Sequence, residues 1–255
     1  MPATPEWPPR SAPRLFVEQT VELDCQLRIS GNQAHYLSRV MRVSEGDTII
    51  VCDDETGEWA TRVVETGKRE IILDPVEKLR EREPVPDLWL CPALLKKDRF
   101  DLVLEKATEL GVARIAPIIT RRCVADKLNA ERARNIVTEA AEQCARTALP
   151  QIDEPVKLDN FLRNLPANRV LFFADELMSG EGAVSAAHVF ASNPPPAAIL
   201  IGPEGGFDDA ERDLIRSHHQ AKAVALGPRI LRGETAAIAA IALWMGVMGD
   251  WRAQD

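Results

Sequence analysis

The sequence contains few of the residues that form disulfide frameworks and metal centres. Its 255 residues include five cysteines and four histidines, and the cysteines are scattered without C-x-x-C spacing. An odd, dispersed set of this kind argues against a disulfide framework and against a zinc site. We therefore expect reduced thiols in the cytoplasm and no bound metal.

Long apolar runs are also missing. No stretch approaches the length that spans a membrane, and residues 1–13, with five prolines, lack the apolar segment of a signal peptide. We expect a globular protein with no membrane partner, in which residues 1–13 form a disordered Pro-rich tail. An apolar fraction of 45% with 27% charged residues fits this class.

The common nucleotide signatures are absent as well. There is no G-x-G-x-x-G motif, and no Gly-Lys-Ser/Thr follows a glycine loop. The sequence therefore lacks the usual marks of dinucleotide and nucleoside triphosphate sites.

Two segments near the C-terminus share one layout. The apolar run 198–201 leads into GPEGGF at 202–207, and the run 223–226 leads into GPRILRGET at 227–235. Each run is typical of a buried parallel strand, and a helical pattern follows each loop. The layout predicts two glycine loops side by side at the carboxyl ends of strands, where open α/β sheets bind ligands.

The composition of these loops favours a ligand with a cationic centre and no phosphate. Pro203 and Pro228 each remove an N–H donor, whereas a phosphate site needs several converging N–H groups. The carboxylates of Glu204 and Glu234 and the backbone carbonyls remain. They suit an adenine edge, ribose hydroxyls and a sulfonium, which S-adenosylmethionine combines. The alternative is that both Gly-Pro pairs are only tight turns between strand and helix.

Five segments, spread over most of the chain from about residue 14, carry a family resemblance. They are residues 35–42 (HYLSRVMR), 105–112 (EKATELGV), 139–146 (EAAEQCAR), 201–207 (IGPEGGF) and 226–236 (LGPRILRGETA). The set resembles the RsmE family of SPOUT methyltransferases, which methylate N3 of a uridine in 16S ribosomal RNA of the small subunit. The resemblance implies an S-adenosylmethionine-dependent homodimer that acts in rRNA processing and ribosome biogenesis.

The residue patterns divide the chain into two parts. Residues 14–80 have short β-branched runs separated by turn residues, which predicts a small β-barrel. The charged segment 77–86 links it to residues 87–255, where strand and helix patterns alternate as in a parallel α/β domain. The resemblance implies that these parts are a PUA-like RNA-binding barrel and a SPOUT domain with a C-terminal trefoil knot. The expected α/β strands are 88–91, 113–119, 170–174, 197–201 and 222–226, and the expected helices are about 98–110, 129–148, 183–190, 208–219 and 235–249.

The resemblance places the cofactor on the two glycine loops. The residues expected to bind it are Ile201, Gly202, Pro203, Gly205, Leu226, Gly227, Leu231, Arg232, Glu234, Thr235 and Ala236.

Methylation of uracil N3 needs a cation or a base, because its N–H is a weak acid and the nitrogen is a poor nucleophile until the proton leaves. Arg232 is the expected cation, and Glu204 is the expected proton acceptor or neighbour of the sulfonium. On the expected helix 129–148, Glu142 and Arg146 fall on one face. The family match favours a place for them in the target-base pocket, and an exposed Glu142–Arg146 ion pair is the alternative.

Basic residues are concentrated locally although the net charge is −8. Neither 25–44 nor 111–125 contains Asp or Glu. If 32–42 is helical, one face carries His35, Arg39 and Arg42, and Ala34, Leu37 and Met41 form the packed face. The family's use of the barrel to bind RNA favours RNA contacts over a merely solvated surface. The expected RNA-binding residues are Arg28, His35, Arg39, Arg42, Arg121 and Arg122.

Two other functions are compatible with the sequence. One is a non-catalytic ribosome-assembly or RNA-binding protein that keeps the fold, and binding of S-adenosylmethionine would distinguish the enzyme from it. The other is an α/β enzyme with a phosphate ligand, against which the loop prolines count. Apolar residues cover most of the circumference of the helix expected at 235–249, which predicts burial in the core or against a second copy.

Overall fold

The computed structural model describes residues 7–9, 11–175 and 185–252. By its internal contacts the chain divides into two compact units, residues 1–84 with 141–149 and residues 85–140 with 150–255. Residues 1–6 and 10 of the predicted Pro-rich tail lie outside the described residues.

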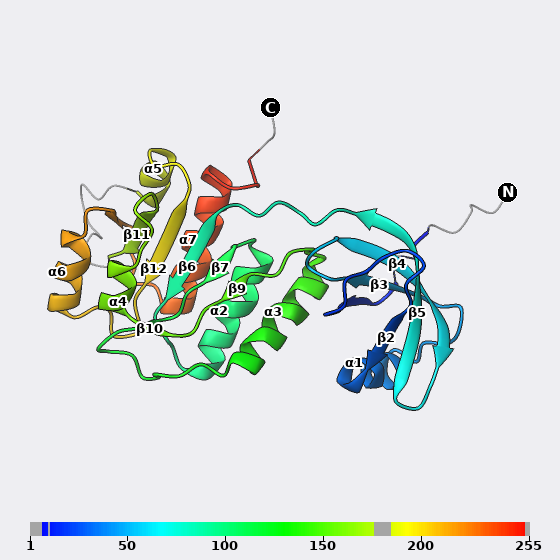
Figure 1. Cartoon of the computed structure of the whole chain (residues 1–255). Coiled ribbons are helices and arrows are strands. Elements are labelled where there is room, and N and C mark those ends of the chain that lie inside the picture. Colours follow the sequence, from blue (N-terminus) through cyan, green and yellow to red (C-terminus); the bar gives the residue numbers. More distant parts are fainter. Residues whose placement is uncertain (1–6, 10, 176–184, 253–255) are drawn as a thin grey trace. The chain divides into compact units, whose positions relative to one another are not determined.

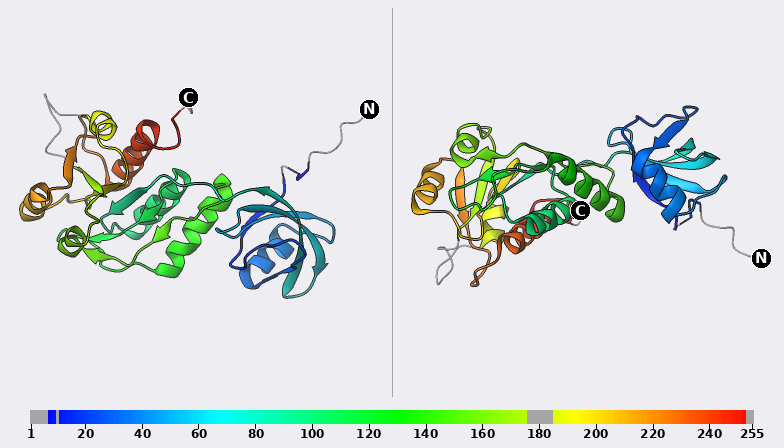
Figure 2. Two further views of the ribbon diagram at one scale, coloured as in Figure 1. Left: turned by 45° about the horizontal axis from the view of Figure 1, so that its top comes forward. Right: turned by 90° about the horizontal axis from the view of Figure 1, so that it is seen from below.

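The first unit is a five-stranded sheet that curls around its own core (Figure 2). Its strands are β1 (Arg14–Phe16), β2 (Leu27–Ser30), β3 (Thr48–Cys52), β4 (Glu58–Thr66) and β5 (Glu70–Arg80). They pair in the order β1-β3-β4-β5-β2, parallel for β1 with β3 and antiparallel elsewhere. In β2, Leu27 and Ile29 are buried while Arg28 and Ser30 are exposed, the alternation of a sheet with one solvated face.

A short helix follows β2 in the first unit. Helix α1 (Gly31–His35) continues into the π-helical segment η1 (Tyr36–Val40). Ala34 and Leu37 are buried as predicted, but Met41, predicted on the same packed face, is exposed. The prediction for Met41 is wrong because the winding widens into a π-helix, and because Arg42, with φ of 54°, ends the helical conformation.

The second unit is built on a six-stranded sheet in which every pair is parallel (Figure 1). The strand order is β13-β11-β12-β6-β7-β9. The strands are β6 (Leu88–Pro92), β7 (Arg114–Ile115), β9 (Gln151–Ile152), β11 (Val170–Ala174), β12 (Ala197–Ile201) and β13 (Ala221–Val224), and a separate pair is formed by β8 (Ile118–Ile119) and β10 (Val156–Lys157). The helices are α2 (Lys97–Glu109), α3 (Ala130–Cys144), α4 (Leu158–Arg163), α5 (Ala186–Ala191), α6 (Asp209–Ser217) and α7 (Gly233–Val247).

The central strand β12 explains why this sheet is buried on both faces. Ala197, Ile199 and Ile201 face a core with residues of α2, α3, α5 and α7. Ala198 and Leu200 face a second core with residues of α4 and α6. A strand covered on both sides has a continuous apolar sequence rather than an alternating one, which is the pattern of 197–201.

The structure differs from the expected second unit in three respects. The expected strand 113–119 is divided into β7 and β8, which belong to different sheets. The helix expected to reach residue 148 ends at Cys144, because Ala145 has φ of 60°. The short elements β9, β10 and α4 have no counterpart among the expected ones. The two glycine loops lie side by side as predicted, since both line one pocket, although β11 lies between the strands that they follow.

Among the helices that the described residues form, none is both long enough and apolar enough to cross a membrane.

Candidate ligand pocket at the strand ends

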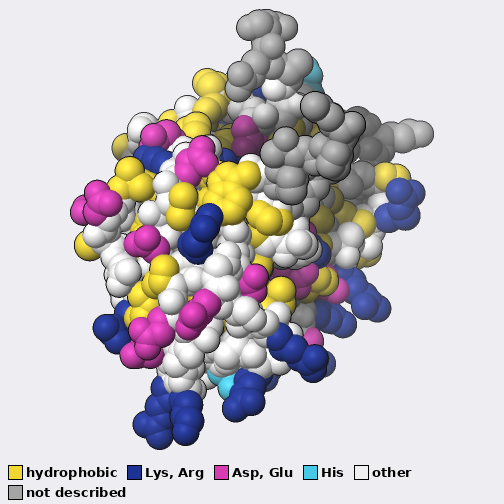
Figure 3. Space-filling model, turned by 90° about the vertical axis from the view of Figure 1, so that its right-hand side faces the viewer, with side chains coloured by type: hydrophobic (Ala, Val, Ile, Leu, Met, Phe, Trp, Pro, Cys, Tyr) yellow, Lys and Arg dark blue, Asp and Glu magenta, His cyan; other side chains and the backbone are white. Residues whose placement is uncertain are grey.

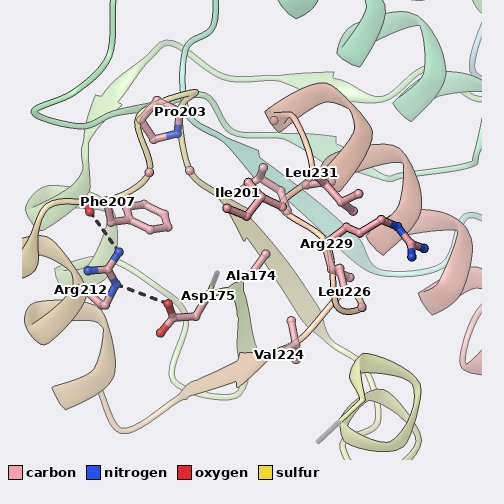
Figure 4. Close-up of a pocket in the computed structure, with 16 residues that line it drawn as sticks. Ala174, Asp175, Ile201, Pro203, Phe207, Arg212, Val224, Leu226, Arg229 and Leu231 are labelled. Carbon is pink, nitrogen blue, oxygen red and sulfur yellow. Dashed lines mark hydrogen bonds and ion pairs between the residues drawn. The ribbon is translucent and has the colours of Figure 1, made fainter. Parts of the chain in front are cut away.

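A pocket lies at the carboxyl ends of β11, β12 and β13 (Figure 4). It is lined by Ala174, Asp175, Ile201, Gly202, Pro203, Gly206, Phe207, Arg212, Val224, Leu226, Gly227, Arg229, Ile230, Leu231, Gly233 and Ala236. Seven residues expected at a cofactor site are therefore brought together: Ile201, Gly202, Pro203, Leu226, Gly227, Leu231 and Ala236. Gly205 of the first loop, Arg232 at the N-cap of α7, and Glu234 and Thr235 in its first turn do not line the pocket.

The loop after β12 is shaped by tight local packing. A Cβ at Gly202 would lie 3.1 Å from the ring of Phe207, which is buried. Gly206 has φ of 65° and donates its N–H to the carbonyl of Pro203. Helix α6 then begins with Asp208 in a capping box with Glu211, as the sequence predicts. The hydrogen bond from the Glu211 N–H lowers the pKa of the Asp208 carboxyl, and the nearby Arg121 guanidinium lowers this pKa further.

The loop after β13 is anchored to the first loop by close backbone packing. Gly227 has φ of 110°, in the region that favours glycine, with open space around the position of a Cβ. At the other end of the loop, a Cβ on Gly233 would lie 3.1 Å from Leu95 and 3.3 Å from the Gly202 carbonyl oxygen. Arg232 is the N-cap of α7 and its side chain is exposed. Its guanidinium makes none of the hydrogen bonds or ion pairs found among the described residues.

An arginine of α2 connects the carboxylates of the two loops. The Arg99 guanidinium lies 3.3 Å from Glu204 Oε1 and 3.9 Å from Glu234 Oε1. Glu234 is buried, and its Oε2 has no hydrogen-bond partner among the described residues. The sequence predicts roles for both glutamates, but Arg99 lies more than a hundred positions away and no local pattern connects it to them.

Buried Asp175 and Arg212 line the pocket and belong to a cluster of ion pairs. Asp175 follows β11 and accepts from Arg216 at 2.5 Å, and its Oδ1 lies 3.4 Å from Arg212 Nε. Arg212 also donates to the carbonyl of Phe207 at 3.3 Å (Figure 4). The predicted site misses this cluster, because it contains no residue of β11 or the segment after it. The only indication of it in the sequence is Asp175, which directly follows the apolar run 170–174.

Two arginines expected to contact RNA lie against the first loop. Arg122 donates to the carbonyl of Gly205 at 2.7 Å. The N–H of Arg121 donates to Glu211 at 2.7 Å, and its guanidinium pairs with Asp208 at 2.9 Å. These contacts connect the segment after β8 to the loop after β12. Contact of Arg121 and Arg122 with RNA stays a prediction.

Glu142 and Arg146 belong to the first unit and contact other residues of it. Glu142 accepts from the N–H of Phe16 at 2.8 Å, and the Arg146 guanidinium lies 3.8 Å from Glu83. Burial lowers the pKa of Arg146, although Glu83 opposes the shift. Because α3 ends at Cys144, the two side chains do not share a helix face. A role for them in the target-base pocket stays a prediction.

The other residues expected to bind RNA lie on the first unit. His35, Arg39 and Arg42 are exposed on and beside α1 and η1. Arg28 on β2 pairs with Glu70 at 2.6 Å. In the space-filling view of Figure 3, Lys and Arg side chains gather along the lower edge of the face. Within the described part of the chain, no group of three or more His, Cys, Asp or Glu residues could hold a metal.

The chain is similar to RNA-modifying proteins over both units. It matches the RNA methyltransferase domain family over residues 81–245 and the RNA methyltransferase PUA domain family over residues 29–76. It is 31% identical to ribosomal RNA small subunit methyltransferase E of Rickettsia conorii, over 90% of this chain and 93% of the relative.

Two solved structures share the fold over nearly the whole chain. The ribosomal RNA small subunit methyltransferase E of Neisseria gonorrhoeae, bound to S-adenosylmethionine, has a TM-score of 0.82 and 25% identity, and covers 93% of this chain and 98% of that one. A Legionella pneumophila protein with the cofactor S-adenosylmethionine bound has a TM-score of 0.82 and 28% identity, and covers 94% and 99%.

Proposed function

This chain belongs to the RsmE family of RNA methyltransferases, and we propose that it methylates N3 of a uridine in 16S ribosomal RNA with S-adenosylmethionine as the methyl donor. The observation that supports this most directly is the pocket formed by the two Gly-Pro loops at the strand ends. The names of the relatives support small-subunit ribosomal RNA as the substrate, and the cofactor bound in two similar structures supports S-adenosylmethionine as the donor. The resemblance of the sequence motifs supports uridine N3 as the methylated atom.

The residues of the pocket fit S-adenosylmethionine better than a phosphate ligand. Ile201, Phe207 and Leu231 give it apolar walls that suit an adenine ring. Pro203, at the head of the first loop, offers no N–H, so the loop lacks the donor row of a phosphate cradle. Arg229 is one of the residues that line the pocket, and its guanidinium has no partner among the described residues. With its side chain turned toward the pocket, it would suit the carboxylate of the methionine part.

When bound, S-adenosylmethionine supplies an electrophilic methyl group on a sulfonium. The chain must hold uracil N3 in line with that methyl and stabilise the charge left when its proton leaves. Arg232, exposed at the start of α7, is the proposed cation. Glu204 is the proposed proton acceptor, and Arg99 at 3.3 Å holds it in place. Because N3 lies on the Watson–Crick edge, the base must be unpaired when it enters the site.

Calorimetry and mapping of the modified nucleotide test this function. We expect micromolar binding of S-adenosylmethionine or its demethylated product, with no competition from ATP or NAD. The methylated uridine should be present in 16S RNA of cells with the protein and absent without it. Binding of ATP but not of S-adenosylmethionine would exclude the assignment. Cofactor binding without any loss of the modification would favour the non-catalytic ribosome-assembly protein.

We also propose that the chain acts as a homodimer in the cytoplasm and carries the trefoil knot of its family. Leu102 on α2, Leu243 on α7 and Trp251 after it are large apolar side chains that stay exposed, although α7 is otherwise largely buried. A second copy packed against α2 and the C-terminal end of α7 would cover such side chains. Sedimentation equilibrium should give about twice the monomer mass of 28.2 kDa.

The double substitution Arg39→Glu and Arg42→Glu should weaken RNA binding about tenfold and leave cofactor affinity unchanged. Each arginine is exposed and has no ion-pair partner among the described residues, so each can take a phosphate. Loss of two such contacts should also flatten the dependence of affinity on salt concentration. Filter binding of 16S RNA at several salt concentrations measures both. The control is Arg134→Glu, which reverses the charge of an exposed arginine elsewhere, on α3. Wild-type affinity and salt dependence in the double variant would mean that this face is only solvated.

Arg122→Ala should weaken binding of S-adenosylmethionine about fivefold. The side chain donates to the carbonyl of Gly205, and loss of one exposed charge-assisted hydrogen bond costs about 1 kcal/mol. Calorimetry with the cofactor alone is the measurement, and Arg134→Ala serves as the control for loss of an exposed arginine. Unchanged cofactor affinity with weaker RNA binding would instead support the predicted RNA contact of Arg122.

A further inference from the structure

The outer face of α1 and η1 carries three large apolar side chains in water. Tyr36 is 43% exposed, Val40 64% and Met41 39%. Tyr36 and Val40 are four positions apart, and Met41 follows directly. Three such residues in six positions form a patch rather than the scattered apolar exposure of an ordinary surface. Leu37, between them in sequence, is fully buried and anchors the segment to the core of the first unit.

Unpaired cations interleave with this patch. Arg39 and Arg42 are exposed and make no hydrogen bond or ion pair with any described residue. The tip of the β4–β5 hairpin adds Lys68 and Arg69, both exposed. It lies near α1, because Ser30 at the start of the helix pairs with Glu70. Glu70 itself is paired with Arg28 at 2.6 Å, so its charge is already compensated.

The backbone of this segment departs from a regular helix at the same residues. Met41 donates its N–H to the carbonyl of Tyr36, five positions earlier. Arg42 adopts φ of 54°, a conformation that costs a non-glycine residue free energy. Segments of π-helix occur often at functional sites. This one exposes Met41 and Arg42 beside Tyr36, where continued α-helical periodicity would pack Met41 inward.

We propose that Tyr36, Arg39, Val40, Met41 and Arg42 form a binding face for an unpaired segment of RNA. A base stacks on the Tyr36 ring and contacts Val40 or Met41, and Arg39 and Arg42 contact the flanking phosphates. This rests on the proposed function, because the RNA is the substrate of the same protein.

The side chains favour this occupant over two others. A duplex is recognised through its phosphates and 2′-hydroxyls and offers no free base for an aromatic ring, whereas single strands are held by stacking together with a basic groove. A second copy of the chain is disfavoured, because a symmetric contact through this face would bring the same arginines of both copies together. The four cations of the patch and hairpin match a polyanion.

The chain contains one tyrosine, which makes the test specific. Protein labelled with 3-fluorotyrosine should give one fluorine resonance for the folded state. That resonance should shift when an unpaired 16S-derived oligonucleotide is added and should stay in place with the same sequence as a duplex. Tyr36→Ala should weaken binding of the unpaired oligonucleotide about tenfold or more, the usual effect of losing one stacked base. Tyr36→Phe should restore most of the affinity.

A matched pair of valines and the salt dependence separate stacking from charge. Val40→Ala should weaken binding severalfold, whereas Val76→Ala should not, although Val76 on β5 is also exposed, at 42%. Tyr36→Ala should leave the slope of affinity against salt unchanged, because no phosphate contact is lost. A Tyr36 fluorine shift that depends on protein concentration without RNA would show that a second copy binds this face, and it would overturn the proposal.

The remaining outcomes distinguish this proposal from the proposed function. If the wild type methylates 16S RNA but Tyr36→Ala binds the oligonucleotide as tightly, the stacking face is wrong and the function stands. If the resonance shifts with unpaired RNA but no methyl transfer occurs, the face is right and the methyltransferase assignment fails.

Discussion

Arg232→Ala should slow methyl transfer by about 10²–10³-fold while changing the affinity for S-adenosylmethionine little. The guanidinium is exposed at the N-cap of α7, outside the set of residues that line the pocket, and has no partner among the described residues. It can therefore approach the target base. Loss of a donor that stabilises a developing anion costs roughly 2–4 kcal/mol, which corresponds to this rate loss.

The measurement is single-turnover transfer to small-subunit RNA, with a cofactor titration of the same preparation. Arg232→Lys should recover only part of the rate, because an ammonium does not reproduce the planar guanidinium. Arg134→Ala should transfer at the wild-type rate. If Arg232→Ala loses cofactor binding outright, Arg232 is a binding residue. The catalytic role would then return to Glu204 or to Glu142 and Arg146.

Gly227→Val should abolish detectable cofactor binding, a loss of more than about a hundredfold. At φ of 110° a β-branched residue is strained. Relief of that strain would displace the loop, and with it Leu226 and Leu231, which line the pocket. The structure thus gives a backbone reason for glycine here. The space around its Cβ position is open, so a steric clash within the chain is not the cause.

Gly46→Val is the control for backbone strain as such. Gly46 has φ of 92° and equally open surroundings, but it lies in a turn of the first unit. Calorimetry should find normal cofactor affinity for this variant, and circular dichroism should show that both variants are folded. Equal loss of affinity in both would mean that the effect is general destabilisation rather than a change in the pocket.

The sequence predicts the elements of the second unit well because their patterns are strong and local. The runs at 170–174 and 197–201 coincide with β11 and β12, since Gly, Pro or charged residues delimit them. The capping box at Asp208 is found for the same reason. The family match then supplies the PUA-like and methyltransferase units, which agree with the two matched families. Periodicity alone would not distinguish a SPOUT domain from other parallel α/β folds.

The features that sequence patterns leave out or misplace depend on contacts distant in sequence or on backbone conformation. The position of β11 between β12 and β13 is a property of the whole sheet. Asp175, Arg212 and Arg216 meet only because of that position. Helix α3 ends before Arg146 because Ala145 is left-handed, and Met41 is exposed because η1, which precedes it, is π-helical. Sequence patterns assign both Ala145 and the residues of η1 to ordinary α-helix.

The place of β11 also bears on how the pocket is assembled during folding. Leu171 of β11 pairs with Ala198 of β12 on one edge and with Ala221 of β13 on the other. The second edge of β11 is therefore covered only when β13, about fifty residues later in the chain, has paired with it. Pairings of such long sequence separation are slow to form. The β4–β5 hairpin of the first unit joins strands that are neighbours in sequence and should acquire structure earlier. We therefore expect a refolding intermediate with protected amides in β4 and β5 and exchanging amides at 171–173, and recovery of cofactor binding only in the final phase.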